Sequence, residues 1–192
     1  MPVAQAEAFA FLAARQSYPM KAMTGETPDR AALEQILTAA LRVPDHGKLE
    51  PWRLIVLTRP DLDRLADLAE ARARELGGDA EKIAKGRGQY DNGHLAVAVI
   101  SAPVAAEKVP EVEQRLSAGA LCLNIVNAAS AAGWGASWLT GWPAHDAAFT
   151  ARAFGCTGAE TVAGIVHIGG RGAAAPDRPR PALARVVRWG LE

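Results

Sequence analysis

The chain has 192 residues, a length typical of one domain, and its 49% hydrophobic and 22% charged residues are the composition of an ordinary globular protein. Its 21 basic and 21 acidic residues cancel, so no net electrostatic field favours nucleic acid or an anionic membrane. We therefore expect a single domain over residues 1–192, with no nucleic acid and no membrane among its partners.

The first fifteen residues, MPVAQAEAFAFLAAR, have no basic start and include Glu7, unlike a secretory signal. Cys122 and Cys156 lie in apolar segments and are not spaced as a metal site, so we expect buried thiols in a reduced cytoplasm. The segment 116–145 carries no charge, yet glycines and Pro143 interrupt it. This pattern favours a buried helix and strand over a membrane helix.

In the N-terminal half, hydrophobic spacing predicts helices at residues 3–15, 28–42 and 61–76, and a buried strand at 52–58. The second helix has Thr27 as its predicted N-cap and Pro28 at its first position. The polar, glycine-rich segment 79–93 predicts a short helix followed by a mobile loop.

The C-terminal half predicts buried strands at 94–103, 135–140 and 161–170, a long helix at 110–132, and a helix that ends at Gly155. The tail from Arg171 is rich in proline and arginine, but its end, ARVVRWG at 184–190, reads as a strand-like fragment. Helices and strands alternate around one predicted sheet, so the fold class is α/β or α+β.

The helix predicted at 110–132 is composed almost entirely of small and apolar residues beyond Arg115. A monomer of this size has difficulty in surrounding such a helix completely. We therefore expect a second copy to cover part of it in a two-fold dimer. The alternative is the central helix of a monomer.

Familiar catalytic and metal-binding motifs are missing from the sequence. No two of the four histidines are spaced three or four residues apart, so the spacing indicates no metal site. There is neither a G-x-S-x-G nucleophile motif nor a G-x-G-x-x-G dinucleotide fingerprint.

Cationic and hydrogen-bonding residues instead gather where predicted helices end. Arg15, Gln16 and Ser17 close the first helix, and Arg42 closes the second, followed by His46 in an irregular loop. A cation at a helix C-terminus can simply complement the helix dipole. Two such clusters, each joined to an irregular segment, favour an anionic, planar ligand bound by charge-assisted hydrogen bonds.

Four segments in this order resemble the flavin-dependent nitroreductase family, specifically its short YdjA-like branch: ARQSYP, ALRVPDHGKLEPWRLIVL, SAGALCLNIVNAASAAGWGASWLTG and AFGC…VAGIVHIGG. The resemblance covers residues 5 to 172, and the loop with R-x-P-D-H followed by P-W-R is its most specific part. It implies an α+β fold, a three-layer α-β-α sandwich around a mostly antiparallel sheet. It also implies a homodimer with one FMN at each of two sites between the protomers, and residues 171–192 as an extended tail on the partner subunit.

The resemblance assigns Arg15, Gln16 and Ser17 to the FMN phosphate and ribityl chain. It assigns Arg42 and His46 of the same protomer to the isoalloxazine ring. Trp138, Leu139 and Thr140 would complete the site from the partner subunit.

The chain departs from the family pattern at both ends of this site. Gln16 stands where a second arginine is common, and Leu139-Thr140 replaces a more polar Arg-Ser pair. The last predicted strand is followed by GGRG in place of the expected Gly-x-Pro, so Arg171 is a candidate to supply the phosphate charge that Gln16 does not.

The loop after Arg42 then has a physical explanation. Pro44 and Gly47 keep the chain irregular, so His46 and nearby amides can point outward to the polar edge of a ring. Asp45 is expected to orient the loop through local backbone hydrogen bonds. A purely structural role for His46 is the alternative.

The resemblance implies an FMN oxidoreductase that passes electrons from NADH or NADPH to a nitroaromatic, a quinone or a similar small acceptor by a ping-pong mechanism. No side chain is required as an acid or a base, so no catalytic residue is assigned. Two alternatives stay open: an FMN enzyme of different chemistry (dehalogenation or heterocycle oxidation), and a non-catalytic dimer that stores or senses FMN.

Overall fold

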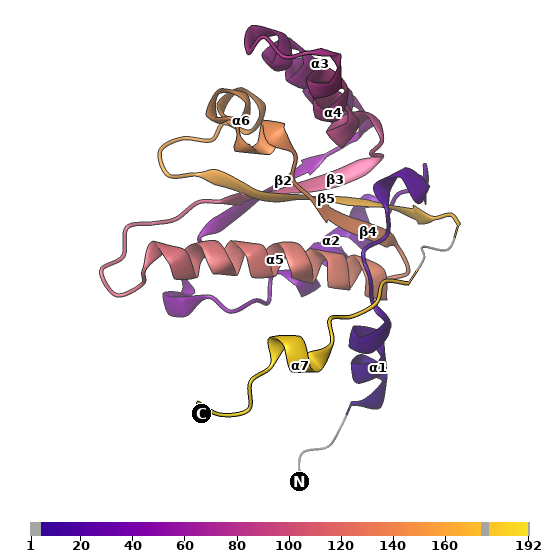
Figure 1. Cartoon of the computed structure of the whole chain (residues 1–192), viewed down its shortest axis with the longest axis vertical. Coiled ribbons are helices and arrows are strands. Elements are labelled where there is room, and N and C mark those ends of the chain that lie inside the picture. The colour runs from indigo at the N-terminus through magenta and orange to yellow at the C-terminus, as the bar shows by residue number, and fades with distance from the viewer. Residues whose placement is uncertain (1–4, 174–176, 192) are drawn as a thin grey trace.

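An antiparallel sheet of five strands lies between two layers of helices (Figure 1). The structure is a computed structural model and describes residues 5–173 and 177–191. The strands are β1 (Met23–Thr24), β2 (Trp52–Leu57), β3 (Leu95–Ser101), β4 (Gly135–Leu139) and β5 (Thr161–Arg171). β5 is central and pairs with β1, β3 and β4, while β2 pairs with β3 at an edge.

The helices are α1 (Ala6–Ala14), α2 (Arg30–Ala40), α3 (Arg59–Glu75), α4 (Ala80–Asp91), α5 (Glu111–Ala131), α6 (Ala147–Phe154) and α7 (Leu183–Val186). Short 3₁₀ turns lie at Met20–Ala22, His46–Lys48 and Trp142–His145. No helix in the described part of the chain is both long and apolar enough to cross a bilayer.

The alternation of side chains along β3 explains the three layers. Leu95, Val97 and Val99 pack into a core with α2 and α5 on one face of the sheet. Ala96, Ala98 and Ile100 pack into a second core with α3, α4 and α6 on the other face. Since both faces are covered, the strand is apolar throughout. The predicted α+β class, with a three-layer sandwich and an antiparallel sheet, is confirmed.

The predictions for the start of α2 and for β2 need correction. The N-cap of α2 is Asp29 and not Thr27, because the Asp29 carboxylate accepts a hydrogen bond from the Ala32 backbone N–H over 2.8 Å. The strand predicted at 52–58 is an edge strand, and Val56 is 41% exposed rather than buried.

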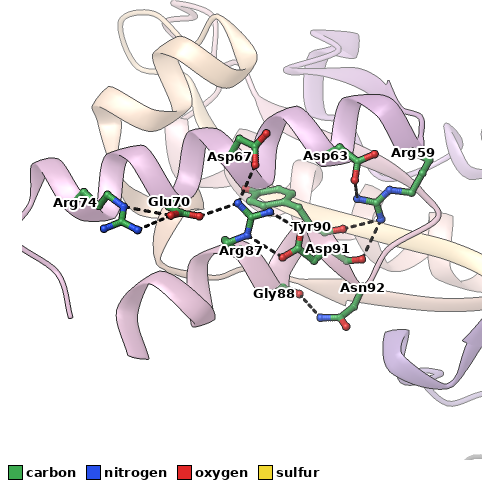
Figure 2. Close-up of polar contacts among 10 residues, drawn as sticks. All are labelled: Arg59, Asp63, Asp67, Glu70, Arg74, Arg87, Gly88, Tyr90, Asp91 and Asn92. Atoms are coloured by element: carbon green, nitrogen blue, oxygen red, sulfur yellow. Dashed lines mark hydrogen bonds and ion pairs between the residues drawn. The ribbon is translucent and has the colours of Figure 1, made fainter. Parts of the chain in front are cut away.

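The segment 79–93 was expected to be a short helix and a loop, but it is the complete helix α4. Asp79 caps it, and its carboxylate accepts from the Lys82 N–H over 2.8 Å. Figure 2 shows α4 packed along α3, with Arg87 donating to Asp67 and Glu70 of α3 over 2.8 and 2.9 Å. Contacts with α3 thus offset the low helix propensity of the glycines in α4.

The long helix was predicted almost to the residue and is α5. One side of it packs on the sheet, but Val112, Leu116 and Leu123 on the other side are 61%, 68% and 45% exposed. Helices α1 and α7 project beyond the α5 layer (Figure 1), and neither contains a buried residue. The segment 184–190, predicted as strand-like, instead contains most of the single helical turn α7, and within the described residues it pairs with no strand.

Candidate functional site

A cavity of about 490 Å³ lies where the end of α1 meets the end of β5. It is lined by Phe11, Ala14, Arg15, Gln16, Tyr18, Ser130, Arg171 and Gly172. Three of the predicted ligands, Arg15, Gln16 and Arg171, therefore meet here although they are far apart in the sequence. Ser17 is adjacent but exposed, and it does not line the cavity.

Tyr18 fixes the segment that carries these ligands. Its backbone N–H donates to the Ala136 carbonyl oxygen of β4 over 2.8 Å, and its hydroxyl donates to the Ala173 carbonyl oxygen. Its ring lies so close to Gly135 that a methyl group there would be 2.9 Å from the ring. The buried Tyr18 thus holds the chain after α1 against both β4 and the segment after β5.

Arg171 closes the carbonyl end of α5. Its Nε donates to the Trp134 oxygen over 3.2 Å and its Nη2 to the Ser130 oxygen over 3.1 Å. A cation at this end compensates the negative pole of the helix. Arg171 lines the cavity, and its third guanidinium nitrogen, Nη1, carries two further N–H donors.

A further guanidinium, which the sequence analysis did not single out, lies near the cavity. Arg180 of the tail donates to the Ala13 carbonyl oxygen at the end of α1. The only signal in the sequence was the arginine-rich composition of the tail.

The loop after α2 holds the second predicted cluster. His46 Nδ1 lies 2.7 Å from Glu113 Oε2 in the first turn of α5. The Asp45 carboxylate accepts from the backbone N–H groups of Leu49 and Glu50 over 3.1 and 2.9 Å. The predicted role of Asp45 in orienting the loop is therefore confirmed.

Polar side chains of α5 bind the same loop. Ser117 donates to the Pro44 oxygen over 2.7 Å, and Asn124 donates to the oxygens of Ala40 and Arg42 over 2.8 and 3.2 Å. Arg42 itself is exposed. Ser117 and Asn124 of α5 thus position the candidate ligand loop.

The His46 cluster and the Arg15 cavity lie near opposite ends of α5. From Glu113 to Ser130 the helix rises by about 25 Å, at about 1.5 Å per residue. His46 lines a separate cavity of about 340 Å³ with Pro44, Glu113, Leu116, Ser117 and Ala120. Within one protomer His46 and Arg15 therefore do not meet, because α5 lies between their cavities, and their joint role at one FMN stays a prediction.

The third predicted cluster lies at the end of β4. The indole of Trp138 covers Gly164, and its Nε1 donates to the Ala163 oxygen over 3.2 Å. It is 40% exposed and its edge reaches Gly119 in the middle of α5. Leu139 is half-buried and Thr140 is exposed, and neither lines the cavities of Arg15 or His46.

The two cysteines are buried and free, as predicted. Burial raises the pKa of the Cys122 thiol to about 12 and also raises the pKa of the Cys156 thiol, so neither is a reactive thiolate at neutral pH. Within residues 5–173 and 177–191, no three His, Cys, Asp or Glu side chains are grouped as a metal site.

Comparison with known proteins identifies the class to which this fold and these clusters belong. Residues 12–170 match the sequence profile of the nitroreductase family. The chain belongs to the nitroreductase family. Its YdjA-like branch is indicated by Escherichia coli YdjA, provisionally named an NAD(P)H nitroreductase, which is 30% identical over 142 residues, 74% of this chain and 77% of YdjA.

Other relatives agree with this assignment. A Haemophilus influenzae protein, also provisionally named an NAD(P)H nitroreductase, is 34% identical over 85% of this chain and 88% of its own. A nitroreductase-like family protein from Bacillus cereus has the same fold, with a TM-score of 0.76, 20% identity and 98% of both chains covered. A Bacteroides fragilis nitroreductase with bound FMN has a TM-score of 0.71, with 19% identity over 95% of this chain and 98% of that one.

Proposed function

We propose that the protein is an FMN-dependent oxidoreductase that passes electrons from NADH or NADPH to a small acceptor such as a nitroaromatic or a quinone. Family membership and the names of the Haemophilus and Escherichia relatives support the donor. The FMN in the Bacteroides structure supports the cofactor. The observation that carries the proposal is the convergence of Arg15 and Arg171 on one cavity.

The residues of this cavity fit the phosphate end of FMN. The phosphate of FMN is an anion whose oxygens accept hydrogen bonds. Guanidinium groups bind such oxygens through paired, charge-assisted hydrogen bonds. Arg15 and Arg171 supply two such groups, and the side-chain amide of Gln16 lines the same cavity. Because Arg171 also compensates the carbonyl end of α5, an anion there is not repelled by the helix.

The exposed surface supports a homodimer. Val112, Leu116 and Leu123 form a line of apolar side chains on α5, and Trp138 adds to them from β4. Helices α1 and α7 contain no fully buried residue, and Phe9 of α1 is exposed. A second copy of the chain would cover these surfaces, and residues 177–191 of the expected tail would pack on it. Residues 174–176 and 192 of that tail lie outside the described part of the chain.

A two-fold dimer also resolves the separation of the two clusters. When two copies of α5 pack antiparallel across a two-fold axis, the first turn of one lies beside the last turn of the other. Arg15 and Arg171 of one protomer would then share a site with His46 and Arg42 of the partner subunit. We propose this cross-subunit arrangement in place of a single-protomer site.

FMN, when bound, would supply the hydride and electron transfer chemistry. The chain would hold its phosphate with Arg15 and Arg171, and would direct donors at the polar edge of the ring with Arg42 and His46. Trp138 would form an apolar wall, with Leu139 and Thr140 beside it. One open pocket would receive the nicotinamide and, after its departure, the acceptor, which is a ping-pong order. We also propose that the protein is located in the cytoplasm.

The first test is a visible spectrum of the purified protein, followed by anaerobic addition of NADH or NADPH and then of menadione. We expect yellow protein that bleaches with a nicotinamide and recovers with the quinone. Protein that takes up no added FMN, or a bound flavin that stays oxidised with both nicotinamides, would contradict the proposal.

The phosphate role is tested with Arg15→Ala. Loss of a charge-assisted hydrogen bond costs roughly 1.5–3 kcal/mol, so we expect FMN to bind about 10- to 100-fold more weakly. Binding of riboflavin, which lacks the phosphate, should change little. Arg74→Ala is the control, because Arg74 pairs with Glu70 on α3. Equal losses for FMN and riboflavin would contradict a phosphate role.

A further inference from the structure

His46 is paired with a carboxylate that the proposed function does not yet use. Its Nδ1 lies 2.7 Å from Glu113 Oε2, and the two side chains are 57% and 45% exposed. Both line the cavity near the N-terminal end of α5. Exposed ion pairs contribute little to folding stability, so stability alone gives a poor reason for this contact.

The backbone around His46 is already fixed by other contacts. Asp45 binds two backbone N–H groups of the loop, and Ser117 binds the Pro44 oxygen. Lys48 and Glu50 have φ angles of 54° and 47°, in the left-handed region that side chains other than glycine rarely adopt. With the backbone of the loop held in this way, the side chain of His46 can still rotate. The hydrogen bond to Glu113 fixes the orientation of its imidazole.

The chemistry of the pair also decides where the imidazole carries its proton. An ionised carboxylate only accepts hydrogen bonds, so Nδ1 must be the protonated nitrogen. In a histidine, the hydrogen bond of one ring nitrogen sets the role of the other. Glu113 therefore leaves Nε2 as the nitrogen available to a ligand.

We propose that Glu113 is a positioning residue for the flavin site, which holds His46 with Nδ1 protonated and Nε2 directed to the ligand. This inference rests on the proposed function. It assigns Glu113 of the partner subunit to the ring end of a site whose phosphate end is formed by Arg15.

The chain offers a matched control in the same helical turn. Glu111 is also an exposed glutamate in the first turn of α5, but it pairs with Arg115, whose Nε lies 2.8 Å from its Oε1. Glu111→Ala removes the same charge from the same end of the helix without touching His46. An effect seen for Glu113 alone therefore cannot come from the helix dipole.

The experiment measures FMN dissociation constants and the tautomer of His46 in the ¹⁵N-labelled full chain without added ligand. Without Glu113 to orient the imidazole, His46 should lose its hydrogen bond to FMN. We therefore expect Glu113→Ala to weaken FMN binding about tenfold. The same change should shift the His46 proton toward Nε2. Glu113→Gln keeps an acceptor oxygen, so it should bind FMN within about threefold of the wild type and keep Nδ1 protonated. Glu111→Ala should match the wild type in both measurements.

Three results would overturn the inference. The first is an FMN affinity in Glu113→Ala equal to that of the wild type. The second is an equal loss of FMN affinity in Glu113→Gln and Glu113→Ala, which would indicate an effect of charge and not of orientation. The third is a wild-type chain in which His46 is protonated on Nε2. If the wild type binds FMN in any of these cases, the proposed function still stands. A wild-type chain that takes up no FMN overturns the proposed function and this inference together.

Discussion

His167 is a histidine enclosed in the core of the sheet. It lies on β5 and is 1% exposed, and its Nδ1 has no hydrogen-bond partner in the part of the chain that the structure describes. Gly93 lies against the ring, where a methyl group would be 2.5 Å from Nδ1. Burial, and then the nearby charges of Arg59 and His94, lower the pKa of His167 to about 4. The ring is therefore neutral in the folded protein at neutral pH.

We expect this histidine to destabilise the protein in mild acid. Its pKa is about 6.5 in the unfolded chain, so between pH 6.5 and its folded pKa the unfolded state binds more protons. The free energy of unfolding should therefore fall by about 2 kcal/mol from pH 6.5 to pH 4.5, as measured by urea unfolding. His167→Gln should flatten this slope, while the exposed His145→Gln should retain it. The same slope in the wild type and in His167→Gln would contradict this origin.

Helix α4 contains two glycines in different surroundings. A Cβ on Gly86 would lie 2.7 Å from Cζ2 of Trp142, whose Nε1 donates to the Lys82 oxygen of the same helix over 3.1 Å. A Cβ on Gly88 would meet only Asn92 Nδ2, at 3.6 Å. Gly86 is therefore needed for close packing of the indole, whereas Gly88 lowers helix propensity without such a contact.

Alanine at these two positions should change stability in opposite directions. We expect Gly86→Ala to destabilise the protein by about 1–3 kcal/mol, because the added methyl group displaces Trp142. Gly88→Ala should stabilise it by about 0.5–1 kcal/mol through helix propensity. Urea unfolding of both variants measures the difference. If both variants changed the free energy of unfolding in the same direction, the packing of Trp142 would not require a glycine at position 86.

Helices and strands that are determined by their own sequence were predicted better than those that depend on contacts with other elements. β3 and α5 were predicted well, because an apolar run and a long helical period leave few alternatives. α4 was underestimated, because its stability comes from packing on α3, where Tyr90 is buried in one core with Leu62 and Leu65. The tail was predicted as strand-like from its valines, but a strand needs a partner that the sequence does not specify.

The same limit applies to the candidate site. The family resemblance selected Arg15, a departure from the family pattern selected Arg171, and the fold brings the two to one cavity. It placed His46 in the same protomer, because motif order carries no information on distance across a helix of 21 residues. Glu113 was missed entirely, although Glu113, Ser117 and Asn124 are the α5 side chains that hold the loop.

The arrangement of the whole dimer can be tested by mixing two chains that each bind FMN weakly. If each site combines Arg15 of one chain with His46 of the other, an Arg15→Ala chain paired with a His46→Ala chain has one site that carries both changes and one site that carries neither. Two-tag purification isolates this mixed dimer, and FMN titration counts its tight sites. We expect one wild-type site per mixed dimer and none in either parent dimer, each of which lacks a hydrogen-bonding group at both sites. If both residues came from one chain, each site of the mixed dimer would carry one change, and no tight site would return. That outcome would reject the antiparallel apposition of α5 while leaving the assignment of the individual ligands intact.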